Sequence, residues 1–139
     1  MKVPPPGLVP ISSIPEWVAE FFVLSQPLRM GLEAYLSLGK KKPTSIHIVH
    51  AKRNINIEVK AAHAYPSFVV DNVTPSKDHF LAFVVYNDKF EDLSVVPKVF
   101  IVPSVEVARI TKHINEERRV TMVGLAKYKD NWAALSGAR

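Results

Sequence analysis

A carboxylate and a lysine lie two residues apart in the segment 54–62. Three aliphatic residues alternate there with Asn56, Glu58 and Lys60, which is the period-two pattern of a β-strand. Glu58 and Lys60 therefore share one face of the predicted strand. In phosphodiester hydrolysis a carboxylate can hold a divalent cation, while a lysine can orient or activate the attacking water and offset phosphate charge. The spacing allows this chemistry, although any strand with one solvated face produces it often.

Other reaction classes find little support in the sequence. The chain has no cysteine, which excludes disulfides, thiolate zinc sites and cysteine nucleophiles. His47 and His50 are three residues apart, which places them on opposite faces of a strand, and the remaining histidines show no two-ligand spacing on one helix. The five glycines form no phosphate-binding loop, and no serine lies in a nucleophile elbow. Any metal must be held by carboxylate, imidazole or carbonyl groups.

The charge balance indicates a polyanionic partner. The chain carries 18 Lys and Arg residues against 13 Asp and Glu residues, a formal net charge of +5, and phosphate contacts supply most of the sequence-independent affinity for nucleic acid. The predicted nucleic-acid-binding residues are Lys40, Lys41, Lys42, Lys52 and Arg53. A lysine run beside a glycine and a proline also fits a solvated turn, so both interpretations stay open.

The length of 139 residues fits one domain with one core. Residues 1–15 hold five of the eleven prolines and are predicted to form an extended arm, and residues 16–139 are predicted to form the domain. No apolar run is long enough to span a bilayer, and the N-terminus lacks a secretory pattern. We expect a cytoplasmic protein without a membrane partner.

The elements that position these residues follow from periodicity. Apolar residues at helical spacing predict a helix from Pro15 to about Met30, with Gly31 after its end. A sheet of about five strands is then predicted, with strands at 34–38, 46–50, 54–62, 80–86 and 99–102. The short polar link 51–54 predicts an antiparallel hairpin, and the almost wholly apolar run 80–86 predicts a strand covered on both faces.

The remainder of the chain is predicted to cover this sheet. Ser104 can cap a second helix, whose residues Val105, Val107, Ala108 and Ile110 would face the sheet and which would end at about His113. A polar link at 115–119 would lead to a short strand at 120–123. The tail should dock its large apolar side chains on the core, because a free tail would not need them. These side chains are Tyr128, Trp132 and Leu135.

The order of these segments resembles small bacterial proteins of the PD-(D/E)XK, or restriction-endonuclease-like, nuclease superfamily. The matching segments read AEFFVLSQPLRMGLEAYLSLG, IHIV, NIEVKAA, HFLAFVVYND, VFIVPSVEV and YKDNWAAL. The resemblance implies an α/β fold in which helices flank a central mixed sheet of about five strands. It also implies that Glu20, Glu58 and Lys60 are catalytic, that Glu58 and His47 hold a metal, that Mg²⁺ or Mn²⁺ is the cofactor, and that DNA is the substrate.

His47 departs from the family pattern, which has an aspartate at this point. It precedes Glu58 by eleven residues, and no aspartate occurs before Val70. Mg²⁺ prefers oxygen ligands, whereas imidazole suits Mn²⁺, Zn²⁺ and other transition metals. Three outcomes are open: the metal has changed, catalysis has lapsed, or Glu20 or Glu33 supplies the missing carboxylate. His47 also fits a purely structural role as a polar residue hydrogen bonded to a neighbour on a half-buried strand.

Two principal hypotheses of function result. The first is a metal-dependent nuclease that hydrolyses DNA with a degenerate metal motif. The second is a catalytically lapsed member of the fold that binds nucleic acid or a protein. A third, an interaction protein with no nucleic-acid role, would fit basic residues dispersed over the surface. One site per chain cuts one strand, so cleavage of both strands would call for a homodimer with two-fold symmetry.

Overall fold

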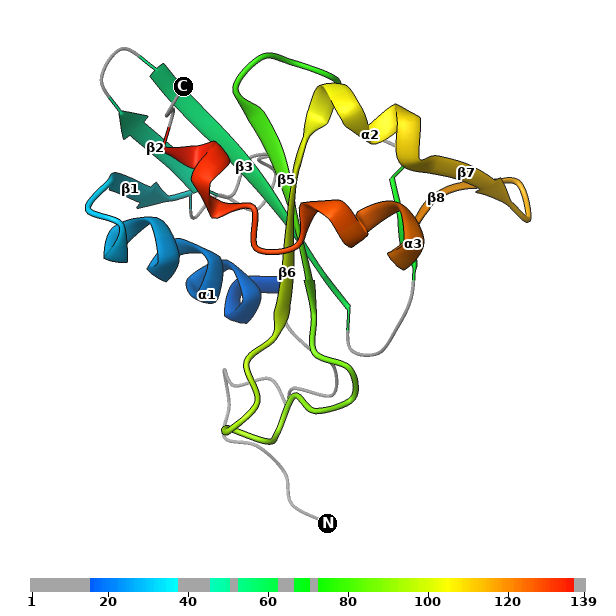
Figure 1. Ribbon diagram of the computed structural model, residues 1–139, viewed down its shortest axis with the longest axis horizontal. Coiled ribbons are helices and arrows are strands. Elements are labelled where there is room, and N and C mark those ends of the chain that lie inside the picture. The colour runs from blue at the N-terminus through cyan, green and yellow to red at the C-terminus, as the bar shows by residue number, and fades with distance from the viewer. Residues whose placement is uncertain (1–15, 38–45, 51–52, 63–66, 71–72, 137–139) are drawn as a thin grey trace, which may run out of the picture.

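The computed structural model describes residues 16–37, 46–50, 53–62, 67–70 and 73–136 (Figure 1). The predicted arm at 1–15 lies outside these ranges, as do Lys40, Lys41, Lys42 and Lys52 of the predicted nucleic-acid-binding set. None of the helices in the described ranges is both long and apolar enough to cross a membrane.

A five-stranded mixed sheet forms the centre of the domain, in the order β1-β2-β3-β5-β6. Only β3 and β5 pair in parallel; the other neighbours are antiparallel. The strands are β1 (Glu33–Leu36), β2 (Ile46–His50), β3 (Arg53–Ala62), β5 (His79–Val85) and β6 (Lys98–Pro103). The five predicted strands, the β2–β3 hairpin and the burial of β5 on both faces are confirmed.

One face of this sheet packs on the helix α1 (Glu16–Arg29). Ala19 and Val23 of α1 meet the aliphatic residues of β2 and β3, including Ile48 and Ile57, in one core cluster. The helix ends at Arg29, close to the predicted end at about Met30, and Gly31 follows it with a φ of +84°, the left-handed conformation that glycine tolerates. Gly31 N donates to Leu28 O and Leu32 N donates to Pro27 O, so two carbonyls of the last turn of α1 have partners.

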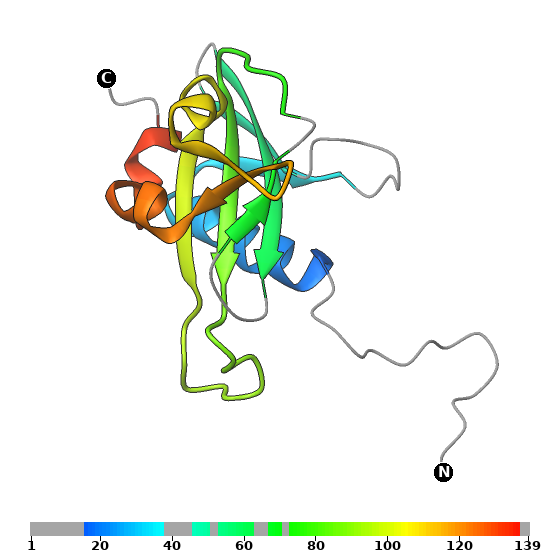
Figure 2. The ribbon, with the colours of Figure 1, turned by 90° about the vertical axis from the view of Figure 1, so that its right-hand side faces the viewer.

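A second core cluster fills part of the opposite face, which we call the site face because it carries Glu58 and Lys60. Over β5 and β6 this face is covered by α2 (Ser104–Ile110), α3 (Met122–Leu125) and a second sheet of order β4-β8-β7. The strands of the second sheet are β4 (Ser67–Val69), β7 (Thr111–Ile114) and β8 (Glu117–Thr121). Figure 2 shows the β7–β8 hairpin on the side of the main sheet away from α1.

Several predictions for the last third of the chain are wrong. The segment 115–119 is no link: Asn115 and Glu116 both have positive φ and form a tight hairpin turn between β7 and β8. The helix α2 ends at Ile110 rather than at about His113, and β8 begins at Glu117 and ends at Thr121, where the prediction had a strand at 120–123.

The predicted cap of α2 is also wrong, and its predicted inner face is right only for Val107 and Ile110, since Ala108 is exposed. Pro103 occupies the N-cap position of α2, and the buried Ser104 hydroxyl instead donates to Ser76 O and accepts from Ser76 N. Val105 is exposed, and Val107 is the buried apolar anchor of this helix. The tail docks as predicted: Tyr128 and Leu135 are buried, and Trp132 packs on the core.

Candidate functional site

Glu58 and Lys60 lie on β3 beyond the end of β2 that the structure describes. The pairing of these strands ends at Ile46 and Ile57, so residues 58–62 of β3 continue beyond the described end of β2. On the site face, Lys60 Nζ lies 3.4 Å from Glu58 Oε2, and only 28% and 20% of the two side chains are exposed. The two side chains thus share one face of the strand, as predicted, and form an ion pair that is largely shielded from water.

A second carboxylate, Glu16, reaches this part of β3 from the first turn of α1. Glu16 Oε2 accepts a hydrogen bond of 3.0 Å from Ala61 N. Burial of the carboxylate raises the pKa of Glu16 above its ordinary value; the Ala61 hydrogen bond and the charge of Lys60 lower it, and the charges of Glu20 and Glu58 raise it. The Glu16 carboxylate therefore lies within the electrostatic range of both Glu58 and Lys60.

The family resemblance assigned the helix carboxylate to Glu20, one turn further along α1. The structure brings Glu16 into contact with β3, and Glu20 acts on Glu16 through its charge. Periodicity places both residues on one side of a helix but does not say which of them meets a strand. The catalytic role of Glu20 stays a prediction, and Glu16, whose carboxylate interacts with the charges of Glu58 and Lys60, becomes a second candidate.

His79 is a further polar neighbour of Glu58 that the sequence analysis did not select. It opens β5, and its Nε2 lies 3.9 Å from Glu58 Oε1, with 14% of the side chain exposed. The separation is longer than a direct hydrogen bond. The parallel register places His79 beside Asn56, two residues before Glu58 on the same face of β3. Only this register, which the sequence does not state, brings His79 to the site.

His47 lies on the site face but not directly opposite Glu58. Its register partner is Asn56, so Glu58 is diagonal to it across the β2–β3 hairpin. His47 Nδ1 lies 2.8 Å from Asn56 Oδ1 and His47 Nε2 lies 2.8 Å from Ser37 Oγ. These contacts match the structural role considered for His47. To bind a metal, the ring would have to exchange one of these partners.

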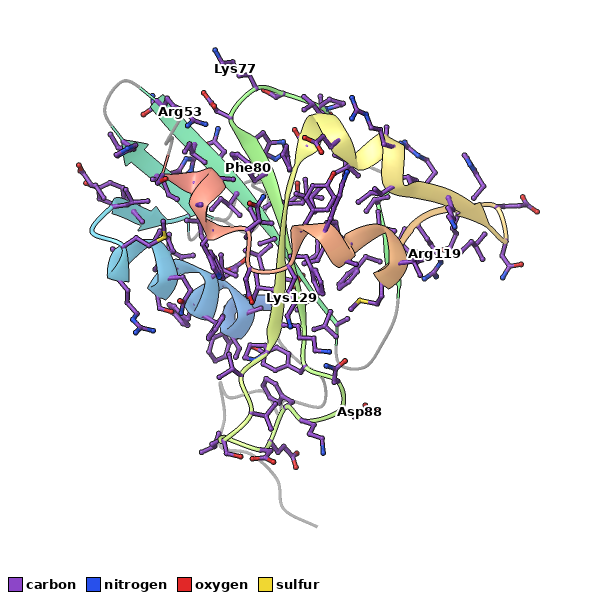
Figure 3. All side chains as sticks on the ribbon, in the orientation of Figure 1. Arg53, Lys77, Phe80, Asp88, Arg119 and Lys129 are labelled. Atoms are coloured by element: carbon purple, nitrogen blue, oxygen red, sulfur yellow. The ribbon has the colours of Figure 1, made fainter. Side chains whose placement is uncertain are left out.

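The basic residues whose ion pairs are described have different acidic partners. Arg53, from the predicted nucleic-acid-binding set, is paired with Asp78, with Arg53 Nη2 2.6 Å and Nε 3.1 Å from Asp78 Oδ1. In Figure 3, Arg53 and Lys77 lie at one end of the molecule, while Arg119 and Lys129 lie in other parts of it. Lys60 is the cation that the described contacts place against Glu58.

The fit of a divalent cation depends on the two carboxylates. No group of three or more histidine, aspartate or glutamate side chains able to hold a metal is found in the described part of the chain. Mg²⁺ is nevertheless commonly held by one or two carboxylates, with waters and substrate phosphate oxygens as its other ligands. Glu58 and Glu16 offer this donor set. Glu33, the third alternative, accepts a hydrogen bond from the Tyr35 hydroxyl on β1 and is not among the described contacts of Glu58.

Two solved nuclease structures are similar to this chain along most of its length. The Holliday junction resolvase Hjc of Archaeoglobus fulgidus is 13% identical with a TM-score of 0.59, and the match covers 88% of this chain and 95% of that chain. A bacterial homing endonuclease is 14% identical with a TM-score of 0.59, and the match covers 87% and 90%. No protein-family profile matches the chain, and no curated protein matches its sequence significantly. At this identity the likeness shows the fold, which is the restriction-endonuclease-like fold predicted from the sequence.

Proposed function

We propose that this protein is a metal-dependent nuclease that hydrolyses phosphodiester bonds of DNA at the Glu58–Lys60 pair. The observation that carries the proposal is the convergence of three charged side chains on residues 58–62 of β3. Glu58 and Lys60 come from β3, and Glu16 comes from α1 on the other side of the sheet. Two carboxylates and one ammonium, of which Glu58 and Lys60 are largely shielded from water, form a set of groups suited to phosphodiester hydrolysis.

The roles follow from the chemistry of each group. A divalent cation held by Glu58 and Glu16 would supply Lewis-acid activation at the phosphate when bound. The Lys60 ammonium would donate hydrogen bonds to a phosphate oxygen or to the attacking water, and its charge offsets the charge of the phosphate. The Ala61 N–H holds one oxygen of Glu16 at β3, which limits the orientations of that carboxylate. His79 would position Glu58 from the neighbouring strand.

A second candidate function is DNA binding without catalysis. It is favoured by the small number of metal ligands among the described residues. Both ring nitrogens of His47 are hydrogen bonded, and no third acidic or imidazole ligand joins the two carboxylates there. On this hypothesis the fold and the Glu58–Lys60 pair persist, but the cation binds too weakly for hydrolysis.

Cleavage of supercoiled plasmid and of single-stranded DNA separates the two candidates. The reactions would contain Mg²⁺ or Mn²⁺ and native protein, Glu58→Gln or the control Lys77→Ala, which removes an exposed lysine. Nicking by the native protein and by Lys77→Ala that is lost in Glu58→Gln supports the nuclease. If the native protein binds DNA but does not cut it with either metal, the proposal is wrong and the second candidate takes its place.

The number of copies bears on the product of the reaction. One site per chain cuts one strand, so a monomer would leave nicked plasmid. A homodimer with two-fold symmetry would be needed for linear product from one binding event. Light scattering of the native protein, with and without DNA, would distinguish these assemblies.

A further inference from the structure

A row of four side chains crosses the site face at right angles to the strands. The registers pair Tyr35 on β1 with His47 on β2, His47 with Asn56 on β3, and Asn56 with His79 on β5. Register partners in neighbouring strands point to the same side of a sheet. The row therefore lies on the face that carries Glu58, which is two residues along β3 from Asn56.

The chemistry of this row is that of a surface for nucleobases. Tyr35 is 53% exposed, and Val49 on β2 is a second exposed apolar residue on this face, with 40% exposed. The Tyr35 hydroxyl donates to the Glu33 carboxylate, which holds the ring on the sheet face. His47, which is also exposed, and Asn56 add an imidazole and an amide next to the phenol ring. Aromatic side chains, histidine among them, stack on unpaired bases, and stacking leaves the two hydrogen bonds of the His47 ring in place.

The dimensions of the row fit a short single-stranded segment. Neighbouring strands lie about 4.8 Å apart, so the two steps from Tyr35 on β1 to Asn56 on β3 span roughly 10 Å. Aromatic rings exposed on a sheet face can each stack on an unpaired base. In a duplex the flat faces of the bases are stacked on one another and cannot reach a ring on a sheet.

We propose that the Tyr35–His47–Asn56 row binds unpaired bases of single-stranded DNA, beside the phosphate that reaches Glu58 and Lys60. This inference rests on the proposed function, because it assigns to the same site a substrate class, DNA with unpaired bases next to the scissile bond. Tyr35 stacks on a base, and His47 and Asn56 contact the neighbouring base. The backbone then runs along β3 toward Lys60.

A matched control for Tyr35 exists on the opposite side of the sheet. Phe21 on α1 has 51% of its side chain exposed, almost the same as Tyr35, and packs edge to face on Trp17. Removing Phe21 deletes an equally exposed aromatic ring on the other side of the domain. If DNA binds through this row, a substitution of Tyr35 should weaken DNA binding and the same substitution of Phe21 should not.

The experiment is fluorescence anisotropy with a labelled single-stranded oligonucleotide and with the blunt duplex of the same sequence, in EDTA so that neither is cut. The proteins are native, Tyr35→Ala, Tyr35→Phe and Phe21→Ala. We expect Tyr35→Ala to weaken single-strand binding by about tenfold, the loss expected for one base stack. Tyr35→Phe should retain most of the affinity because it keeps the ring. The affinity of every variant for the duplex should stay within about twofold of the native value. The affinity of Phe21→Ala for the single strand should also stay within about twofold of the native value.

The outcomes separate this inference from the proposal on which it rests. If the native protein binds DNA and Tyr35→Ala changes neither affinity, or lowers both equally, the row is not a site for unpaired bases, and the proposed nuclease function stands. If the native protein binds neither oligonucleotide, the proposed function and this inference both fail. Circular dichroism and thermal melting of each variant confirm that a lost affinity reflects the surface and not unfolding.

Discussion

Lys60→Ala tests whether the ion pair on β3 acts in catalysis or only in stability. In the proposed reaction the Lys60 ammonium stabilises charge at the phosphate. Deleting one positioned donor of this kind typically lowers the rate by about 10²- to 10³-fold, or about 3–4 kcal/mol in the barrier. We expect a loss in this range for Lys60→Ala.

The structural cost of the same change is much smaller. The pair has a separation of 3.4 Å and side chains that are 28% and 20% exposed, so losing the partner of Glu58 should cost on the order of 1 kcal/mol. For a domain of this size that lowers the Tm by about 3–5 °C. Since domains are stable by about 5–15 kcal/mol, Lys60→Ala remains almost wholly folded at 25 °C. Reduced stability therefore cannot explain a hundredfold loss of rate.

The assay is the single-turnover rate of plasmid nicking at saturating protein, measured together with the Tm by calorimetry. Lys60→Arg keeps the charge and should retain more activity than Lys60→Ala, and Lys77→Ala controls for the loss of any lysine. A Lys60→Ala rate within about threefold of the native rate would refute the catalytic role, since one removed catalytic donor costs far more. A fall of the Tm to near the assay temperature would show that the ion pair is chiefly structural.

Three further changes give distinct results. Burial raises the pKa of Glu16 above its ordinary value of 4.5, so protonation favours the folded state, and this stabilisation is lost as pH rises through the raised pKa. The Tm of Glu16→Gln should therefore be higher than that of the native protein at pH 7, and the two Tm values should be equal below pH 4.5. The variant should also lose nicking activity. A lower Tm at pH 7 would contradict the electrostatic account. His47→Asp should change the nicking rate by less than about fivefold, because position 47 is diagonal to Glu58, with about 7 Å between diagonal positions; a large gain would show that an aspartate is needed at position 47. Burial raises the pKa of Tyr128 to about 12, and the hydrogen bond from its hydroxyl to a carboxylate on α2 is the second cause of this rise. Tyr128→Phe should lower the free energy of unfolding by about 1 kcal/mol at neutral pH. Measured by urea unfolding, this difference between the variant and the native protein should disappear as pH rises from 10 toward 12. A constant difference would show that Tyr128 does not ionise in this range.

The main sheet could be predicted because its strands carry local signals. The period-two alternation of 54–62 and the apolar run of β5 reflect burial on one and on two faces, and the short link 51–54 fixes the antiparallel hairpin. The second sheet could not be predicted in the same way. The strand β4 is only three residues long, and β7 and β8 are mostly polar, since much of their surface faces solvent. The pairing of β4 with β8 joins segments distant in sequence, and the β7–β8 hairpin has too few apolar residues to show its local pairing.

The candidate site was predicted only where it lies within one strand. Glu58 and Lys60 share a face because of their spacing, which is a local property. Glu16 depends on how α1 is placed against β3, and His79 depends on the parallel register of β3 and β5. Both are tertiary relations. The position of His47 could not be predicted either. The spacing of eleven residues between His47 and Glu58 fits the hairpin, but it does not show that the register places Asn56, and not Glu58, opposite His47.

The central claim is that Glu58 and Glu16 converge on one cation-binding site at residues 58–62 of β3. Titration of Mn²⁺ followed by electron paramagnetic resonance tests this directly, with the native protein, Glu58→Gln, Glu16→Gln and the control Lys77→Ala. The account predicts one bound Mn²⁺ per chain in the native protein and in Lys77→Ala, and at least tenfold weaker binding, or about 1.4 kcal/mol, in each glutamine variant. Native-like binding in both glutamine variants, or no binding by the native protein, would contradict it.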